Sequence, residues 1–292
     1  MTMRLNRRAF IGTMGAALLA GRHGEAASIS RLGAQLYTVR AELAKDFDGT
    51  LAKVAAAGYA EVEFAGYFNR SPHEVRDVLK RVKLKAPSAH IDYGSLTGDK
   101  WARAIEGART IGHQYLVNAW VDEPTRNQPD AWKRIADTYN QAAAASKKAG
   151  IQFAYHNHNF EFVPREDLGG KLPFDFLLET LDPALVKIEL DLCWTAAAGK
   201  DPVEYFKRYP GRFPMVHVKG LRKVPATGAA TPIDRVLPEI TEVGHDDVID
   251  WKRIFAQSKT AGIKHYFLEH DVPKQPIESL KASHDYVAGL KF

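Results

Sequence analysis

Cysteine is nearly absent from this sequence, since Cys193 is the single one among 292 residues. One cysteine excludes an intrachain disulfide and a cysteine-rich structural zinc site. It suits either a reducing compartment or a protein that folds before export. Cys193 lies two residues beyond Asp191 and shares its face if a strand continues there, so it is an outside candidate for a metal ligand.

Long apolar runs and dense basic runs are missing as well. Beyond the first two dozen residues, no stretch approaches the about 20 apolar residues that a membrane span needs. We therefore expect a mature protein that is soluble and has no membrane partner. The net charge is only +5 and the basic residues are dispersed. Without a Lys/Arg run interleaved with aromatics, nucleic acid is not an expected partner.

The N-terminus carries a pattern typical of export. The segment Asn6-Arg7-Arg8-Ala9-Phe10-Ile11 is followed by small and apolar residues up to Gly21, as in the twin-arginine signals of bacteria. We predict a signal peptide over residues 1–27, cleaved near Ala26 or Ala27, and one domain over residues 28–292. The expected partner is the twin-arginine export machinery, and the expected location is the periplasm. A frayed basic N-terminus is the alternative.

A helical segment, a glycine and a short apolar run recur in this order at Gly58, Gly112, Gly150 and Gly262. Glycine just past a helix end takes a left-handed conformation, and the chain then turns into a strand. This rhythm is typical of parallel βα units. Eight strands are predicted, near Gly33–Tyr37, Ala60–Phe64, Ala86–His90, Gln114–Asn118, Ile151–Asn157, Val186–Asp191, Pro214–Lys219 and Tyr266–Glu269.

Amphipathic helices are expected between these strands, for example at Ala131–Lys148 and Asp250–Lys259. Hydrophobic residues make up 45% and charged residues 26% of the chain, which is ordinary for a soluble globular protein. The eight units without a break in composition predict an α/β fold, a single (β/α)₈ TIM barrel. A doubly wound open sheet is the alternative, and it is disfavoured because no glycine-rich phosphate loop follows the first strand.

Acidic and metal-capable residues gather at the carboxyl ends of the predicted strands, where barrel enzymes build their sites. These ends contain Glu61 and Glu63, His90, His156 with His158 and Glu161, Glu189 and Asp191, His217 with Lys219, and Glu269 with His270 and Asp271. A lone histidine there is often a satisfied polar residue, and a carboxylate such as Asp271 is often a helix N-cap. Strand ends of a barrel converge, however, and clustered carboxylates repel unless a cation lies among them. Histidines and carboxylates together suit one divalent ion such as Mn²⁺, Co²⁺, Zn²⁺ or Mg²⁺.

Five segments carry a resemblance to a known family. They are Gln35-Leu-Tyr-Thr-Val-Arg40, Tyr155-His-Asn-His-Asn-Phe-Glu-Phe162, Glu189-Leu-Asp-Leu-Cys-Trp194, His217-Val-Lys219 and Phe267-Leu-Glu-His-Asp271. Over roughly Leu32 to Leu290, the sequence resembles the xylose-isomerase-like barrels. This superfamily contains sugar isomerases and epimerases and also the endonuclease that cuts at abasic sites.

The resemblance implies one metal ligand from each of strands five to eight, commonly Glu, Asp, His and Glu. Carried over, the last three are Asp191, His217 and Glu269. At the strand-five position many members have Glu-Asn-His where this chain has His156-Asn157-His158, so His156 is predicted to replace the glutamate. This departure leaves open both the metal preference and the usual pairing of two catalytic glutamates.

The family's chemistry implies a metal that binds a carbonyl oxygen and a neighbouring hydroxyl of a sugar, while a carboxylate removes the adjacent proton. Glu269 is predicted as both ligand and base. The other predicted catalytic residues are Glu161, His158 and His90 on the opposite side, and Lys219, which would steady negative charge. The predicted substrate-binding residues are Tyr37, Glu63, Trp120 and Trp194, although ordinary packing at the barrel rim would also explain the aromatic side chains.

The leading hypothesis is thus a metal-dependent sugar isomerase or epimerase that acts on an unphosphorylated small-molecule carbohydrate, since sugar phosphates are cytoplasmic. If the proton is removed beside a good leaving group, the same site gives β-elimination. A dehydratase or lyase of a keto-sugar or keto-glycoside is therefore the main alternative. A non-catalytic sugar-binding barrel is the other alternative. A nuclease is disfavoured, because abasic-site enzymes assemble several zinc ions and this net charge is low for binding DNA.

Overall fold

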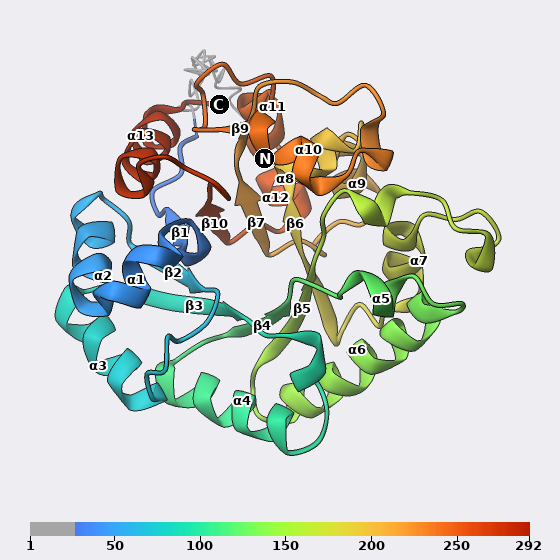
Figure 1. Cartoon of the computed structure of the whole chain (residues 1–292), viewed down its shortest axis with the longest axis horizontal. Helices are drawn as coiled ribbons and strands as arrows, with labels where there is room; N and C mark the ends of the chain where they lie inside the picture. Colours follow the sequence, from blue (N-terminus) through green and yellow to red (C-terminus); the bar gives the residue numbers. More distant parts are fainter. Residues whose placement is uncertain (1–26) are drawn as a thin grey trace, which may run out of the picture.

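The computed structural model describes residues 27–292 of the chain. Eight parallel strands close into one barrel in the order β1-β10-β7-β6-β5-β4-β3-β2, and the helices surround it (Figure 1). The predicted single (β/α)₈ barrel is confirmed, and the open-sheet alternative is wrong. The barrel strands are β1 (Gly33–Gln35), β2 (Glu61–Phe64), β3 (Lys85–His90), β4 (Tyr115–Asn118), β5 (Gln152–His156), β6 (Val186–Asp191), β7 (Met215–Val218) and β10 (His265–Leu268).

Each of these strands overlaps one predicted strand; β6 has the predicted bounds, and no strand end differs from the prediction by more than two residues. The helices are α1 (Arg40–Lys45), α2 (Phe47–Ala56), α3 (Pro72–Val82), α4 (Gly98–Ile111), α5 (Glu123–Arg126), α6 (Ala131–Lys148), α7 (Pro173–Thr180), α8 (Leu192–Ala197), α9 (Pro202–Arg208), α10 (Ile233–Val236), α11 (Trp251–Phe255), α12 (Ser258–Ala261) and α13 (Pro276–Gly289). Helix α6 has the predicted bounds. The predicted helix Asp250–Lys259 is divided into α11 and α12, and the Asp250 side chain caps α11.

The glycines that define the repeated pattern all have a positive φ, at +106°, +99°, +80° and +83° for Gly58, Gly112, Gly150 and Gly262. Gly112 and Gly262 are the left-handed C-caps of α4 and α12. Each glycine thus reverses the chain at a helix end and sends it into the next strand, as the sequence predicts.

One element of the fold is not anticipated by the sequence. After β7, the short strands β8 (Gly220–Leu221) and β9 (Ile240–Thr241) pair antiparallel, and the segment between them contains α10. Strands of two residues have too few residues for an apolar pattern and are not bounded by strong turn signals, so the sequence does not predict them. Ile233 and Leu237 of this segment form part of the cavity described below.

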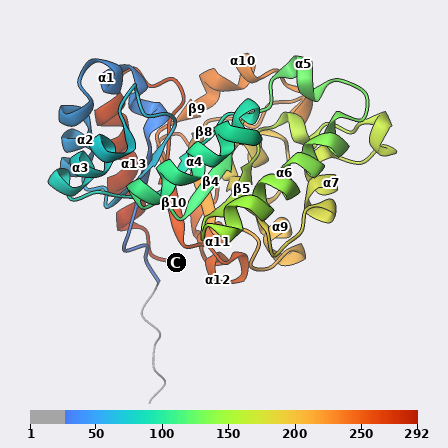
Figure 2. The ribbon, with the colours of Figure 1, turned by 90° about the horizontal axis from the view of Figure 1, so that it is seen from below.

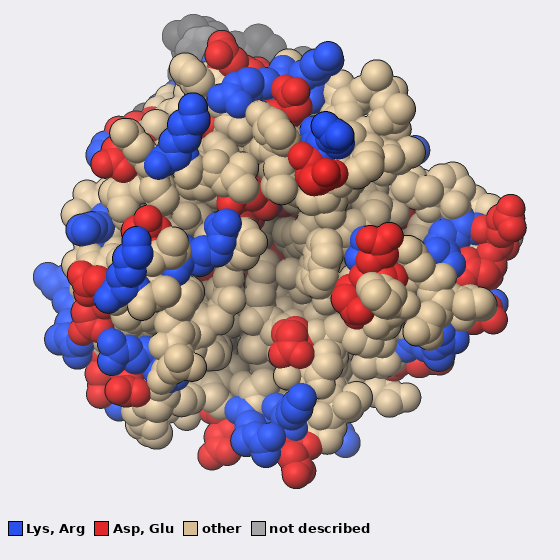
Figure 3. Space-filling view, viewed as in Figure 1, with Lys and Arg blue, Asp and Glu red and all other residues tan. Residues whose placement is uncertain are grey.

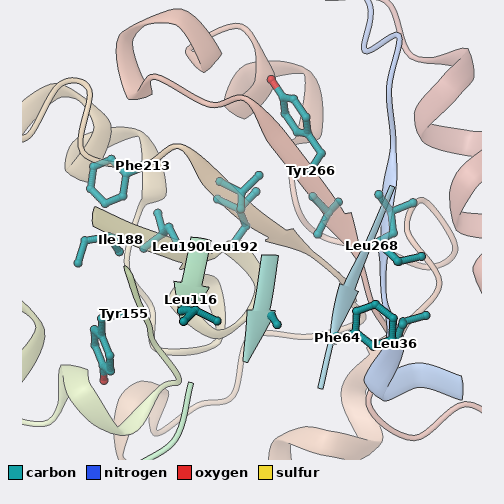
Figure 4. Packing of buried hydrophobic residues seen from close by; sticks show 14 of the residues in the cluster. Leu36, Phe64, Leu116, Tyr155, Ile188, Leu190, Leu192, Phe213, Tyr266 and Leu268 are labelled. Atoms are coloured by element: carbon teal, nitrogen blue, oxygen red, sulfur yellow. The ribbon is translucent and has the colours of Figure 1, made fainter. Parts of the chain in front are cut away.

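Two apolar layers fix the barrel. Strand side chains that point outward, such as Phe64, Leu190 and Leu268, pack against the helices (Figure 4). A smaller cluster contains the inward-pointing Tyr115, Val117, Ala154, Met215 and Phe267. A Cβ at Gly33 would lie 2.5 Å from a ring carbon of Phe267, so glycine lets β1 approach this cluster. This apolar cluster fills the barrel interior below the carboxyl ends of the strands, where polar side chains take its place.

The described N-terminus lies at the end of the barrel opposite α5 and α10 (Figure 2). Ala27 and Phe292 exchange two backbone hydrogen bonds of 2.8 and 3.1 Å. The predicted signal peptide lies outside the described residues, apart from Ala27. Within residues 27–292, no helix combines the length and apolarity needed to cross a bilayer.

Candidate active site

A cavity of about 500 Å³ opens at the carboxyl ends of the strands. Figure 3 shows a hollow near the centre of the drawn face, surrounded mainly by residues that are neither acidic nor basic. The cavity is lined by Tyr37, Ala65, His90, Ile91, Asp92, Ala119, Trp120, His156, His158, Trp194, Lys219, Ile233, Leu237, Glu269, Asp271 and Val272. Polar groups from five barrel strands and the loops that follow them therefore meet in one place.

The four predicted metal ligands converge beside this cavity. Ligand atoms of Asp191, His217 and Glu269 lie within 4.8 Å of one another. His217 Nδ1 is 2.8 Å from Glu269 Oε2 and 3.8 Å from Asp191 Oδ2. His156 Nε2 is 3.9 Å from the same Asp191 oxygen. The structure thus brings the four side chains together, while their role as ligands stays a prediction.

The two carboxylate oxygens of Asp191 have different surroundings. Oδ1 accepts a hydrogen bond of 2.8 Å from the backbone amide of Trp194 and so caps α8. Oδ2 is buried and has no partner with hydrogen-bond geometry. Asp191 therefore caps a helix with one oxygen and directs the other into the cation-capable group. Asp271 is not an N-cap, because Gln275 holds that position in α13.

Lys219 is the cation that the structure itself supplies to these carboxylates. Its Nζ lies 3.1 Å from Asp191 Oδ2, 2.9 Å from Glu269 Oε2 and 3.1 Å from Asp271 Oδ2. Burial alone would lower the pKa of Lys219, but the three carboxylates outweigh it and hold the pKa well above its usual value. The ammonium is therefore charged at neutral pH, and it lines the cavity.

A second polar layer lies just beneath the cavity. Glu63 accepts a hydrogen bond of 2.7 Å from Gln35 Nε2, and its Oε2 lies 2.7 Å from His217 Nε2. Glu189 Oε2 lies 2.9 Å from His90, 3.2 Å from His156 and 3.1 Å from His217. Both carboxylates are fully buried, and neither lines the cavity. The predicted contact of Glu63 with substrate therefore has no support in this geometry.

The four histidine side chains of the site differ in the direction in which their pKa values are shifted. Burial would lower the pKa of His90, but Glu63 and Glu189 outweigh it and raise the pKa to about 9. The pKa of His217 is likewise raised well above its usual value against burial, by Glu189 and Glu269. Burial holds the pKa values of His156 and His158 well below the usual range. Without a metal His217 thus carries two protons, and a ligating nitrogen would have to lose one of them.

The carboxylates show that the site is short of positive charge. Burial raises the pKa of Asp191, because Lys219 and His217 offset the desolvation only in part. The pKa of Asp271 rises to about 6, chiefly through burial and against the attraction of Lys219. Asp191, Asp271 and Glu269 lie around the Lys219 ammonium, and Glu63 and Glu189 lie against the His90 and His217 imidazoles, so five carboxylates share one ammonium and two imidazoles. A divalent cation would relieve this excess of negative charge.

His158 lies in the cavity wall with its Nδ1 buried and without a partner. Its ring is stacked on Phe160 and meets Trp120 edge to face. The Glu161 carboxylate lies behind it, where it accepts hydrogen bonds from the Tyr155 hydroxyl and, at 2.9 Å, from the His158 amide. Glu161 does not line the cavity, so it is placed to fix the backbone of His158 rather than to touch a substrate.

Among the predicted substrate-binding aromatics, Tyr37 and Trp120 are 41% and 44% exposed and stand at the cavity mouth. Trp194 is buried but also lines the cavity. Both rings also have packing partners at the rim, since Arg40 lies 3.9 Å over the Tyr37 ring and Trp120 meets His158 and Phe160 edge to face. Both are available to pack against a ligand.

Three polar residues of the site are absent from the predicted set. Glu189 precedes Asp191 by two residues, so strand alternation alone places both on the inner face. Asp271 follows Glu269 by the same spacing, but in the sequence it was interpreted as a helix N-cap, so its contact with Lys219 was not predicted. Gln35 belongs to a segment that carries the family resemblance, and only the barrel register shows that it faces Glu63.

The donor set fits a divalent metal. Two histidines and two carboxylates suit zinc or manganese, and the buried Asp191 Oδ2 makes no hydrogen bond, its nearby cation being the Lys219 ammonium at 3.1 Å. His156, Asp191, His217 and Glu269 would hold the ion at the cavity. A second cation-capable group, His90, His156, Glu189 and His217, lies in the deeper layer.

Residues 51–291 match the xylose isomerase-like TIM barrel family. The chain belongs to this family. Inosose dehydratase from Clostridium perfringens is 26% identical over 164 residues, which cover 56% of this chain and 51% of that protein. The chain thus matches about half the length of this relative.

Solved structures show the same fold. A sugar phosphate isomerase/epimerase from Parabacteroides distasonis ATCC 8503 superimposes with a TM-score of 0.72 and 26% identity, over 88% of this chain and 96% of that one. The IOLI protein, solved with a bound zinc atom, has a TM-score of 0.69 at 14% identity, over 90% and 99% of the two chains. At this identity the second likeness concerns the fold alone.

Proposed function

We propose that this protein is a metal-dependent lyase that removes water, or another leaving group, from an unphosphorylated keto-sugar. The observation that carries the proposal is the meeting, in one cavity, of the His158 imidazole, the Lys219 ammonium and a cation-capable group. β-Elimination next to a ketone needs a base and stabilisation of the charge at the carbonyl oxygen, which an ammonium and a bound cation can supply. The inosose dehydratases among the relatives favour elimination over isomerisation.

The residues divide this work by position. His156, Asp191, His217 and Glu269 would hold the ion, which when bound polarises the substrate carbonyl and makes the adjacent C–H acidic. The His158 imidazole, which lines the cavity, removes that proton, and Lys219 stabilises the negative charge that develops on oxygen. His90 is the other imidazole in the cavity wall without a ligand role, and it protonates the departing hydroxyl. Glu161 orients His158 through the backbone.

The charge of the lining argues for an uncharged substrate. Among the described residues around the cavity, Lys219 is the only Lys or Arg, and three carboxylates already contact its ammonium. A phosphate needs free cationic or amide donors, and here it would meet Asp92, Glu269 and Asp271 instead. The apolar mouth formed by Tyr37, Trp120 and Val272 suits the nonpolar face of a sugar or the aglycone of a keto-glycoside.

The test is turnover of metal-loaded and metal-stripped protein on inosose, 3-keto-glucose and a hexose phosphate, with products followed by mass spectrometry. We expect loss of water from an unphosphorylated ketone, abolished by chelation and lowered at least about 10²-fold by His158→Asn. His245→Asn, an exposed histidine, is the matched control and should turn over normally. Turnover of only the phosphate, or turnover unaffected by chelation, would contradict the proposal.

An isomerase or epimerase is the second candidate, because the Parabacteroides distasonis structure carries that description at 26% identity. Both reactions begin by removing a proton next to a carbonyl. They differ in whether a leaving group departs, so the products separate them.

We also propose that the protein is exported through its twin-arginine segment to the periplasm, in keeping with an unphosphorylated substrate. Mass spectrometry of protein from the cell envelope should find a chain that begins near residue 28. Cytoplasmic protein with an intact Met1 would contradict this.

A further inference from the structure

The two cation-capable groups overlap at one imidazole. The cavity-side group contains Asp191, His217 and Glu269, and the deeper group contains His90, His156, Glu189 and His217. A neutral imidazole has one lone pair and one N–H. His217 can therefore donate its lone pair to an ion on only one of its two sides.

Glu189 occupies the deeper side of all three imidazoles. Its Oε2 lies 3.2 Å from His156 Nδ1, 3.1 Å from His217 Nε2 and 2.9 Å from His90 Nε2. A carboxylate only accepts hydrogen bonds, so each of these nitrogens carries its proton toward Glu189. Glu63 Oε2 adds a second acceptor 2.7 Å from His217 Nε2.

In a neutral ring the opposite nitrogen holds the lone pair. For His217 that nitrogen is Nδ1, which lies 2.8 Å from Glu269 Oε2 and would release its proton when an ion binds. His156 Nε2 and His217 Nδ1 are 3.9 and 3.8 Å from the same atom, Asp191 Oδ2, which has no hydrogen-bond partner. One carboxylate of β6 thus turns two rings, one from each of the flanking strands β5 and β7, toward a common point. This point adjoins the cavity, whereas Glu189 is fully buried and does not line it.

We propose that Glu189 is a positioning residue that sets the tautomer and ring orientation of His156 and His217, so that one divalent cation binds on the cavity side and none binds in the deeper layer. The inference rests on the metal site of the proposed function. Carboxylates that hydrogen-bond to metal-ligating histidines commonly change metal affinity about 10- to 100-fold when they are removed.

The test compares Glu189→Gln with Glu61→Gln. Glu61 is the matched control, because it is a buried strand glutamate that also contacts a histidine, His265 Nδ1, at 2.7 Å, but at the other end of the barrel. Apoprotein is titrated with Zn²⁺ in competition with a chromophoric chelator. We expect one ion per wild-type chain, a Kd raised about 10- to 100-fold in Glu189→Gln, and a Kd unchanged in Glu61→Gln.

Nitrogen-15 NMR of the histidine side chains in zinc-loaded wild-type protein gives a readout that needs no variant. It should show His156 protonated at Nδ1 and His217 protonated at Nε2. The opposite tautomers, or an unchanged Kd in Glu189→Gln, would overturn the inference and leave the proposed function standing. Two ions per chain, one of them lost in Glu189→Gln, would make Glu189 a ligand and also overturn it. Wild-type protein that binds no ion would overturn the proposed function together with this inference.

Discussion

Glu161→Gln isolates a buried acid whose ionisation opposes folding. The Glu161 carboxyl is 1% exposed, and burial raises its pKa from 4.5 to about 7, against the hydrogen bonds from Tyr155 and the His158 amide. Between these two pH values, the folded state binds more protons than the unfolded state. The free energy of unfolding therefore falls as pH rises through this window.

The magnitude follows from the shift. Each pKa unit corresponds to about 1.4 kcal/mol, so a shift from 4.5 to about 7 costs the folded protein about 3 kcal/mol once the pH is above both values. Glutamine has nearly the same volume and does not titrate. The difference in unfolding free energy, Glu161→Gln minus wild type, should thus increase by about 3 kcal/mol between pH 4.5 and pH 7.5.

Urea denaturation at several pH values, followed by tryptophan fluorescence, measures this difference directly. Glu166→Gln is the control, because Glu166 is an exposed acid a few residues along the same loop, and its difference from wild type should stay flat. A flat or falling difference for Glu161→Gln would refute the reasoning. It would mean that the carboxylate is ionised in the folded protein, held by its hydrogen bonds.

Three further substitutions probe the cavity. Lys219→Met leaves three buried carboxylates without their ammonium, so the free energy of unfolding should fall by about 3–5 kcal/mol and recover in part when Zn²⁺ is added. The exposed control Lys223→Met should leave this free energy unchanged, and a Lys219→Met variant as stable as wild type would contradict the charge argument. Asp191→Asn retains the Oδ1 that caps α8 but loses the negative charge, so activity should fall at low Mn²⁺ and return in part at high Mn²⁺. A loss of activity that Mn²⁺ does not restore, in a variant with normal metal content, would count against a ligand role. Trp120→Ala should raise KM for a keto-glycoside up to about tenfold and leave kcat near normal, since an aromatic contact contributes roughly 0.5–1.5 kcal/mol. A fall in kcat without a change in KM would contradict a substrate-binding role for Trp120.

The barrel was predictable because its signals are local. Gly58, Gly112, Gly150 and Gly262 each close a helix within a few residues of the strand that follows, and α6 is long and strongly periodic. The β8–β9 pair was not predictable, since its strands are two residues long and join segments about twenty residues apart. Local signals do not specify such a pairing.

The position of the candidate site was predictable from the sequence, but the hydrogen bonds and ion pairs within it were less so. Parallel strand ends must converge, so His156, Asp191, His217 and Glu269 meet as expected. Which nitrogen of an imidazole faces which carboxylate depends on strand register and rotamers, and this hid the role of Glu189. Family resemblance could assign ligands but not the contact of Lys219 with Asp271, which only the fold brings about.

The most direct measurement of the central claim is the fate of one ketone substrate in D₂O. Zinc-loaded wild-type protein is incubated with inosose, and proton NMR with mass spectrometry separates loss of water from exchange. We expect an unsaturated ketone that has lost one water, formed only when metal is present. Recovered inosose, or an epimer of it, that carries deuterium next to the carbonyl and keeps every oxygen would contradict elimination and identify an isomerase.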